Sequence, residues 1–77
     1  MNEDLKSALL AYADEYIGQG GAMDPDHGSE VAQKLCAALG SGMWHAEINT
    51  EADRICDIFY GEEIYQCNLT IRTVEIF

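Results

Sequence analysis

Apolar residues recur every three or four positions in the first part of the chain. Over residues 3–17 they follow the i, i+3, i+4, i+7 spacing of one helical face. The positions are Leu5, Ala8, Leu9, Tyr12, Ala13, Tyr16 and Ile17. Asn2 can cap the first turn, where Glu3 and Asp4 suit the positive end of the helix dipole. The pattern predicts a helix over 3–17 that ends at the GQGG segment.

A second helical pattern covers residues 25–39. Its apolar face consists of Val31, Leu35, Ala38 and Leu39. Asp24 can cap this helix, and Pro25 fits the first helical position. Gly28 would weaken the first turn, so Ser29 is an alternative start.

The period changes from helical to alternating at residue 43. Segment 43–48 (MWHAEI) alternates, and so do the two arms around Gly61 and Glu62, which we interpret as a two-residue hairpin loop. Gly61 stands at the first central position, as a type II′ turn requires. In this register both arms share one apolar face, made of Cys56, Ile58, Tyr60, Tyr65, Cys67, Leu69 and Ile71. A slip of one residue would destroy that agreement, so the sequence predicts Cys56 opposite Cys67.

These elements predict an α+β domain over residues 1–77, with two N-terminal helices packed on one face of a three-stranded antiparallel β-meander. The alternative is a third helix at 51–60 with a two-stranded sheet, because short apolar runs fit either period. The alternation shifts after Ile71, which we interpret as a bulge near Arg72. The tail from 73 to 77 would then outrun its neighbour as an apolar edge that can pair with another chain.

Cys56 and Cys67 are expected to be reduced core residues, whereas Cys36 lies at the margin of the apolar face of the second helix. In the predicted hairpin Cys56 and Cys67 form a hydrogen-bonded pair, whose side chains lie farther apart than a disulfide prefers. A zinc site would also need Cys36 and His45, but the four residues are scattered and His45 is predicted on the opposite sheet face. We expect no metal and no cofactor.

The sequence shows no set of residues suited to catalysis. The carboxylates Asp24, Asp26 and Glu30 beside His27 lack calcium-loop spacing and fit the start of a helix. The glycine-rich segments follow predicted helices instead of strands and lack the spacing of phosphate-binding loops. We therefore expect a protein without catalytic residues that is not an enzyme.

Charge is the outlying property of the composition. Fourteen Asp and Glu face four Lys and Arg, a formal net charge of −10. This excludes non-specific binding to nucleic acid or to anionic membranes, which both need a basic surface, and permits a basic partner. High negative charge also favours solubility and accompanies adaptation to high salt. The acidic N-terminal segment does not resemble a signal peptide, so we expect a cytoplasmic protein.

In size and charge, small acidic α+β chains of this kind resemble phage-encoded inhibitors of host defence, such as the anti-CRISPR proteins. The acidic residues predict a surface that imitates the phosphate charge of a nucleic acid, docks on a basic, nucleic-acid-handling partner and does not itself bind nucleic acid or membranes. The alternative is a small structural or accessory subunit that homodimerises through its C-terminal sheet edge. The candidate partner-binding residues are Glu47, Glu51, Asp53, Asp57, Glu62 and Glu63.

Overall fold

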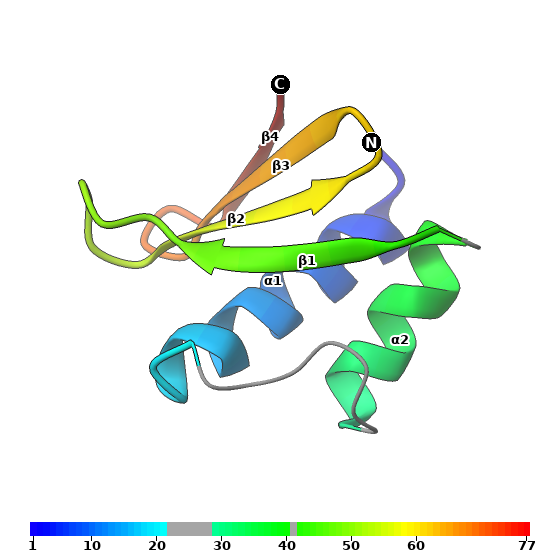
Figure 1. Cartoon of the computed structure of the whole chain (residues 1–77), viewed down its shortest axis with the longest axis horizontal. Coiled ribbons are helices and arrows are strands. Elements are labelled where there is room, and N and C mark those ends of the chain that lie inside the picture. The colour runs from blue at the N-terminus through cyan, green and yellow to red at the C-terminus, as the bar shows by residue number, and fades with distance from the viewer. Residues whose placement is uncertain (22–28, 41) are drawn as a thin grey trace.

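The computed structural model of the chain describes residues 1–21, 29–40 and 42–77. These residues form an α+β fold in which both helices lie on one face of an antiparallel sheet (Figure 1). The sheet has four strands in the order β1-β2-β3-β4. The elements are α1 (Glu3–Gly18), α2 (Glu30–Leu39), β1 (Trp44–Ile48), β2 (Ile55–Tyr60), β3 (Glu63–Asn68) and β4 (Thr73–Ile76).

Helix α1 begins where the sequence predicts. The side-chain oxygen of Asn2 accepts hydrogen bonds from the backbone N–H groups of Asp4 and Leu5, at 2.7 and 3.2 Å. These two donors have no partner within the helix, so the cap stabilises the first turn. The helix lies against the sheet and contacts all four strands.

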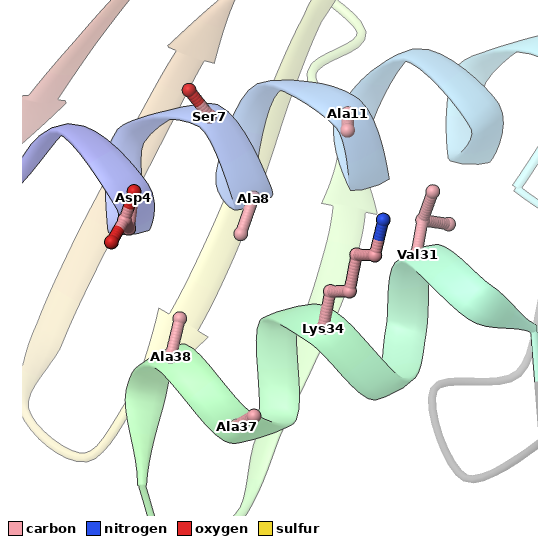
Figure 2. A pocket seen from close by; sticks show the side chains of 8 residues that line it. All are labelled: Asp4, Ser7, Ala8, Ala11, Val31, Lys34, Ala37 and Ala38. Carbon is pink, nitrogen blue, oxygen red and sulfur yellow. The ribbon is translucent and has the colours of Figure 1, made fainter.

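Helix α2 begins after Ser29, whose hydroxyl accepts the N–H of Ala32 at 3.1 Å. The alternative start at Ser29 is therefore confirmed, whereas the cap and first turn predicted at residues 24 and 25 lie outside the described residues. Figure 2 shows α2 running beside α1, and its backbone contacts α1 instead of the described strands. The indole N–H of Trp44 donates to the sulfur of Cys36 at 3.2 Å, which connects α2 to the β1 edge of the sheet.

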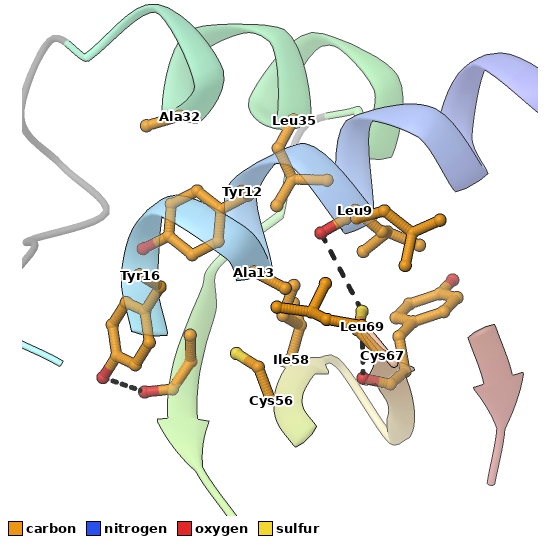
Figure 3. Packing of buried hydrophobic residues seen from close by; sticks show 13 residues of the cluster. Leu9, Tyr12, Ala13, Tyr16, Ala32, Leu35, Cys56, Ile58, Cys67 and Leu69 are labelled. Carbon is orange, nitrogen blue, oxygen red and sulfur yellow. Dashed lines mark hydrogen bonds between the residues drawn. The ribbon is translucent and has the colours of Figure 1, made fainter. Parts of the chain in front are cut away.

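The core lies between α1 and the central strands, as Figure 3 shows. The residues without exposed surface are Leu9, Tyr12, Ala13, Leu35, Cys56, Ile58 and Cys67. They come from both helices and from β2 and β3. Strands β2 and β3 bury the face that their period predicts, whereas α2 buries Ala32, which was not predicted, and leaves the predicted Ala38 exposed. Burial of one large aliphatic side chain contributes about 1.5–3 kcal/mol to folding.

The central hairpin has the predicted register. Cys56 lies opposite Cys67, and Tyr60 lies opposite Glu63 across the two-residue loop. Gly61 has a φ of 61°, whereas Glu62 has no positive φ, a combination that fits a type II′ turn and not type I′. The alternative of a third helix at 51–60 is wrong, because residues 55–60 form the central strand β2.

The C-terminal segment is a fourth strand, so the prediction of a three-stranded meander is wrong. β4 pairs antiparallel with β3, with Val74 opposite Cys67 and Ile76 opposite Tyr65. The tail that was expected to extend beyond its neighbour is therefore paired with β3. The pairing continues one residue beyond β4, because Phe77 and Ile64 exchange backbone hydrogen bonds of 2.8 and 3.0 Å.

A turn replaces the bulge predicted near Arg72. The side-chain oxygen of Asn68 accepts the N–H groups of Thr70 and Ile71, at 3.0 and 3.3 Å, which ends β3 and starts the turn. Arg72 has a φ of 56°, in the left-handed region, and directs the chain back along β3. Ile71, which was predicted to continue the buried face, lies in this turn and is 66% exposed.

One backbone carbonyl on the open edge of β1 already accepts a hydrogen bond from a side chain. Asn49 and Ile55 form a hydrogen-bonded pair, and such pairs alternate along an antiparallel ladder. By this alternation the carbonyl of Ala46 points away from β2, toward the open side of the sheet. The hydroxyl of Tyr16 donates to that carbonyl at 2.8 Å. Helix α1 thus satisfies a backbone group in the middle of an edge strand.

Candidate functional site

The face of the sheet that points away from both helices is called the outer face here. In Figure 1 α1 and α2 lie on the opposite side of the sheet, and no described element covers the outer face. Side chains alternate along each strand, so the outer face is formed by the residues between the core positions. Their side chains fall into cross-strand rows that the pairing register defines.

One of these rows is acidic. Glu47 lies opposite Asp57, Asp57 opposite Gln66, and Gln66 opposite Glu75, and these four residues are called the acidic row. The side-chain amide of Gln66 donates to Asp57 at 3.2 Å. Neighbouring strands are about 4.8 Å apart, so the row gathers three carboxylates within about 15 Å.

The acidic row places two like charges side by side. Like charges directly opposite each other on paired strands are destabilising, and Glu47 and Asp57 are such a pair. Lys34 pairs with Glu30 and Arg54 with Asp14, so these described cations form their ion pairs elsewhere. Like charges repel each other in the acidic row, and no described Lys or Arg pairs with them. A cation from another molecule would reduce this repulsion, so the row is suited to bind one.

The neighbouring row is largely apolar. His45 lies opposite Phe59, Phe59 opposite Ile64, and Ile64 opposite Phe77, and these four residues are called the apolar row. The rings of His45 and Phe59 stack with centroids 4.7 Å apart and planes 8° apart. Phe77 is 64% exposed. The outer face therefore offers rings and carboxylates side by side.

The structure brings together part of the predicted partner-binding set. Glu47 and Asp57 are neighbours in the acidic row. Glu51 and Asp53 lie in the loop 49–54 between β1 and β2, where both are exposed. This loop extends the negative charge beyond one end of the outer face.

Glu62 and Glu63 are separated from that group. They lie at the turn between β2 and β3, at the opposite end of β2 from the loop 49–54. Glu63 pairs with Tyr60, and the alternation places both on the helix side of the sheet. The six predicted residues therefore do not form one continuous patch.

Sequence reasoning missed Glu75 and Phe77, which extend the two rows onto the fourth strand. The signal was present, because segment 73–77 (TVEIF) alternates, with Val74 and Ile76 on the core side. The segment was expected to be a tail that is not paired with β3, so Glu75 and Phe77 were not predicted on the outer face.

The buried cysteines lie behind the outer face, in the core. Cys56 and Cys67 are both free and without exposed surface, as expected from the sequence. Burial, with the charge of Asp57 as a smaller cause, raises the pKa of the Cys56 thiol to about 12. Burial first, then Cys56 and Asp57, raise the pKa of the Cys67 thiol to about 12. Because the thiolate is the reactive form, neither sulfur is a nucleophile near neutral pH.

Elsewhere, a groove of about 570 Å³ runs between α1 and α2 (Figure 2). Its walls are mostly small and apolar, and the lining residues are Asp4, Ser7, Ala8, Ala11, Val31, Lys34, Ala37 and Ala38. Lys34 is already paired with Glu30 at 3.4 Å. The groove offers methyl groups and few polar contacts, so it indicates a binding role less specifically than the outer face does.

In the described part of the chain, no three His, Cys, Asp or Glu side chains gather closely enough to hold a metal ion. Nor does either helix, α1 or α2, combine the length and the apolar character needed to cross a bilayer. No protein-family model, curated protein or solved structure matches this chain.

Proposed function

We propose that this protein is a non-enzymatic binding module that docks through its outer face on a basic, nucleic-acid-binding surface of a partner protein and blocks it. The observation that supports the proposal is the acidic row, which gathers Glu47, Asp57 and Glu75 on the sheet face that no described helix covers. A cationic groove that normally holds phosphates would neutralise this row and relieve its internal repulsion.

The overall charge favours such a partner at long range as well. A net charge of −10 steers the chain toward a basic surface and away from nucleic acid and anionic lipid. Along the row, strand spacing puts the carboxylates about 5 and about 10 Å apart. Phosphates of one DNA strand follow each other at about 3.4 Å along the helix axis, so the acidic row also repeats negative charge along a line, at a lower density than DNA.

A charge-reversal comparison tests this proposal. Glu47→Lys/Asp57→Lys and Glu62→Lys/Glu63→Lys change the net charge equally, but only the first pair alters the acidic row. We expect the first pair to weaken partner binding by about tenfold or more, and the second pair to weaken it less. Substitutions at the exposed Glu47, Glu62 and Glu63 change the free energy of unfolding by less than about 0.5 kcal/mol each. Asp57→Lys costs more, because Asp57 is half-buried and loses the hydrogen bond from Gln66, so a thermal melt of each variant accompanies the binding measurement.

The partner for this measurement is captured from a nuclease-treated lysate, purified, and titrated at about 50 and about 200 mM salt. Binding should weaken as salt rises, and a DNA duplex should compete for the partner. If the two double variants lose equal affinity for the partner, binding depends on net charge alone and not on the acidic row. Unchanged affinity in both pairs, or no competition by the duplex, would overturn the proposal.

A second candidate function, an accessory subunit that homodimerises, is favoured by the free edge of β4. Ile64 and Phe77 form a hydrogen-bonded pair, so alternation directs the backbone groups of Val74 and Ile76 away from β3. Ile76 is 49% exposed and Phe77 is 64% exposed. An edge with free backbone groups and apolar side chains can pair with a second copy.

The mass of the protein in solution distinguishes the two candidates. The binding-module proposal expects a monomer by sedimentation analysis, and the accessory-subunit candidate expects a dimer. If a dimer forms through β4, Ile76→Pro should dissociate it, because proline removes an N–H that a new strand needs. Ile76→Ala is the matched control, since it shortens the same side chain and keeps the N–H. A dimer that tolerates Ile76→Pro would place the interface elsewhere.

A further inference from the structure

The two rows of the outer face are linked strand by strand. Each strand contributes one member of the acidic row and one member of the apolar row, two residues apart along the chain, and Phe77 does so from the position just after β4. The four pairs are Glu47 with His45, Asp57 with Phe59, Gln66 with Ile64, and Glu75 with Phe77. Residues two apart on a strand are separated by about 6.6 Å. One long side chain of a partner can therefore reach a ring and the neighbouring carboxylate at the same time.

The ring positions of this face are held in place. The ring of Phe59 is half-buried and stacks on the ring of His45 at 4.7 Å. The imidazole Nε2 of His45 is 3.1 Å from the carboxylate of Glu47, which orients the imidazole from the other side. The two rings cover each other's facing sides, so the stack is fixed beside Glu47 and Asp57 before any partner arrives.

A lysine and an arginine would use this surface differently. The ammonium of lysine is a compact point charge, for which the carboxylates alone suffice. The guanidinium of arginine is planar, stacks on aromatic rings and donates a fork of hydrogen bonds to a carboxylate. Lysine can also lie over a ring, but arginine engages a ring and a carboxylate together more fully with one side chain.

We propose that the outer face selects arginine over lysine, so that its occupant is an arginine-rich segment of the basic partner. The proposal rests on the proposed function, since it specifies which cation the same face takes. Charge complementarity supports this occupant, because the acidic row is anionic. A second copy of the chain would bring one acidic row against another, which charge repulsion disfavours.

Fluorescence anisotropy with labelled oligoarginine and oligolysine peptides of equal length tests the selection. We expect the arginine peptide to bind the intact chain about five- to tenfold more tightly than the lysine peptide. Phe77→Leu and Phe59→Leu should each reduce this ratio and leave the affinity for the lysine peptide nearly unchanged. Asp57→Asn should weaken both peptides, while Glu3→Gln, the same kind of change on α1, should affect neither beyond its small change in net charge.

Phe77 is 64% exposed, so Phe77→Leu keeps the test decisive even if Phe59→Leu destabilises the fold. Equal affinity for the two peptides, or an unchanged ratio in Phe77→Leu, would overturn arginine selection and leave docking on a basic surface standing. Failure of both peptides to bind at low salt would overturn the proposed function as well.

Discussion

Raising the pH from about 9 to about 11 is expected to remove a large part of the protein's stability, because the buried thiols of Cys56 and Cys67 resist ionisation in the core. Both thiols have a pKa of about 12 in the fold, and a cysteine in an unfolded chain has a pKa of about 8.5. Between these values the unfolded state has lost the thiol protons and the folded state retains them. The free energy of unfolding therefore falls as pH rises through this window, and below about pH 8 the thiols contribute no pH dependence.

The size of this effect is large for a small domain. Each thiol removes about 1.4 kcal/mol per pH unit, so the two together remove about 5 kcal/mol between pH 9 and 11. A domain of this length has a total stability of about 4–12 kcal/mol. Burial also raises the pKa of Tyr16 and Tyr65, so further stability is lost when tyrosines of the unfolded chain ionise.

Urea titrations across this pH range, with reductant present, measure the effect. The variants Cys56→Ala and Cys67→Ala should each show about half the wild-type slope of stability against pH, although each begins from a lower stability. A wild-type slope near zero up to about pH 11 would show that the thiols ionise within the fold. In that case the two sulfurs would not be sealed in the core.

Removing the side chain of Ile58 is expected to cost about 2–5 kcal/mol of stability, whereas the same change at Ile71 should cost less than about 0.5 kcal/mol. Ile58 is in the central strand β2 and has no exposed surface, so Ile58→Ala leaves a cavity beneath α1. Ile71 is 66% exposed in the turn between β3 and β4, so Ile71→Ala removes few contacts.

The comparison also tests where β3 ends. If β3 continued through Ile71 with the alternation of the hairpin, both isoleucines would lie on the buried face and the two losses would be similar. Chemical denaturation of the two alanine variants measures the difference. A loss above about 2 kcal/mol for Ile71→Ala would contradict the turn that begins at Asn68.

The central hairpin could be predicted because several local rules agree there. A two-residue loop with Gly61 first, and alternation in both arms, leave one register that buries a single face. The turn between β3 and β4 follows no such rule, since segment 68–73 (NLTIRT) contains neither Gly nor Pro. Its bend depends on the side chain of Asn68 and on a left-handed Arg72, which is uncommon for that residue type.

The same missed turn limited the prediction of the candidate site. Alternation alone placed Glu47 and Asp57 on the face opposite the core, and the structure agrees. That they form one row with Glu75 depends on the register of four strands, which no local pattern contains. On charge alone, Glu62 and Glu63 were included together with the other acidic residues. Composition does not show that they lie at the opposite end of β2.

The hydrogen bond from Tyr16 to the carbonyl of Ala46 has a consequence for polymerisation. A sheet can extend through many molecules only if both edge strands of each molecule have free backbone groups that pair with a neighbour. Here a strand arriving at β1 would have to displace a tyrosine donor held by α1, whereas β4 presents its backbone groups freely. Edge-to-edge growth through β4 would therefore favour two molecules, and growth beyond them would require Tyr16 to release the Ala46 carbonyl first.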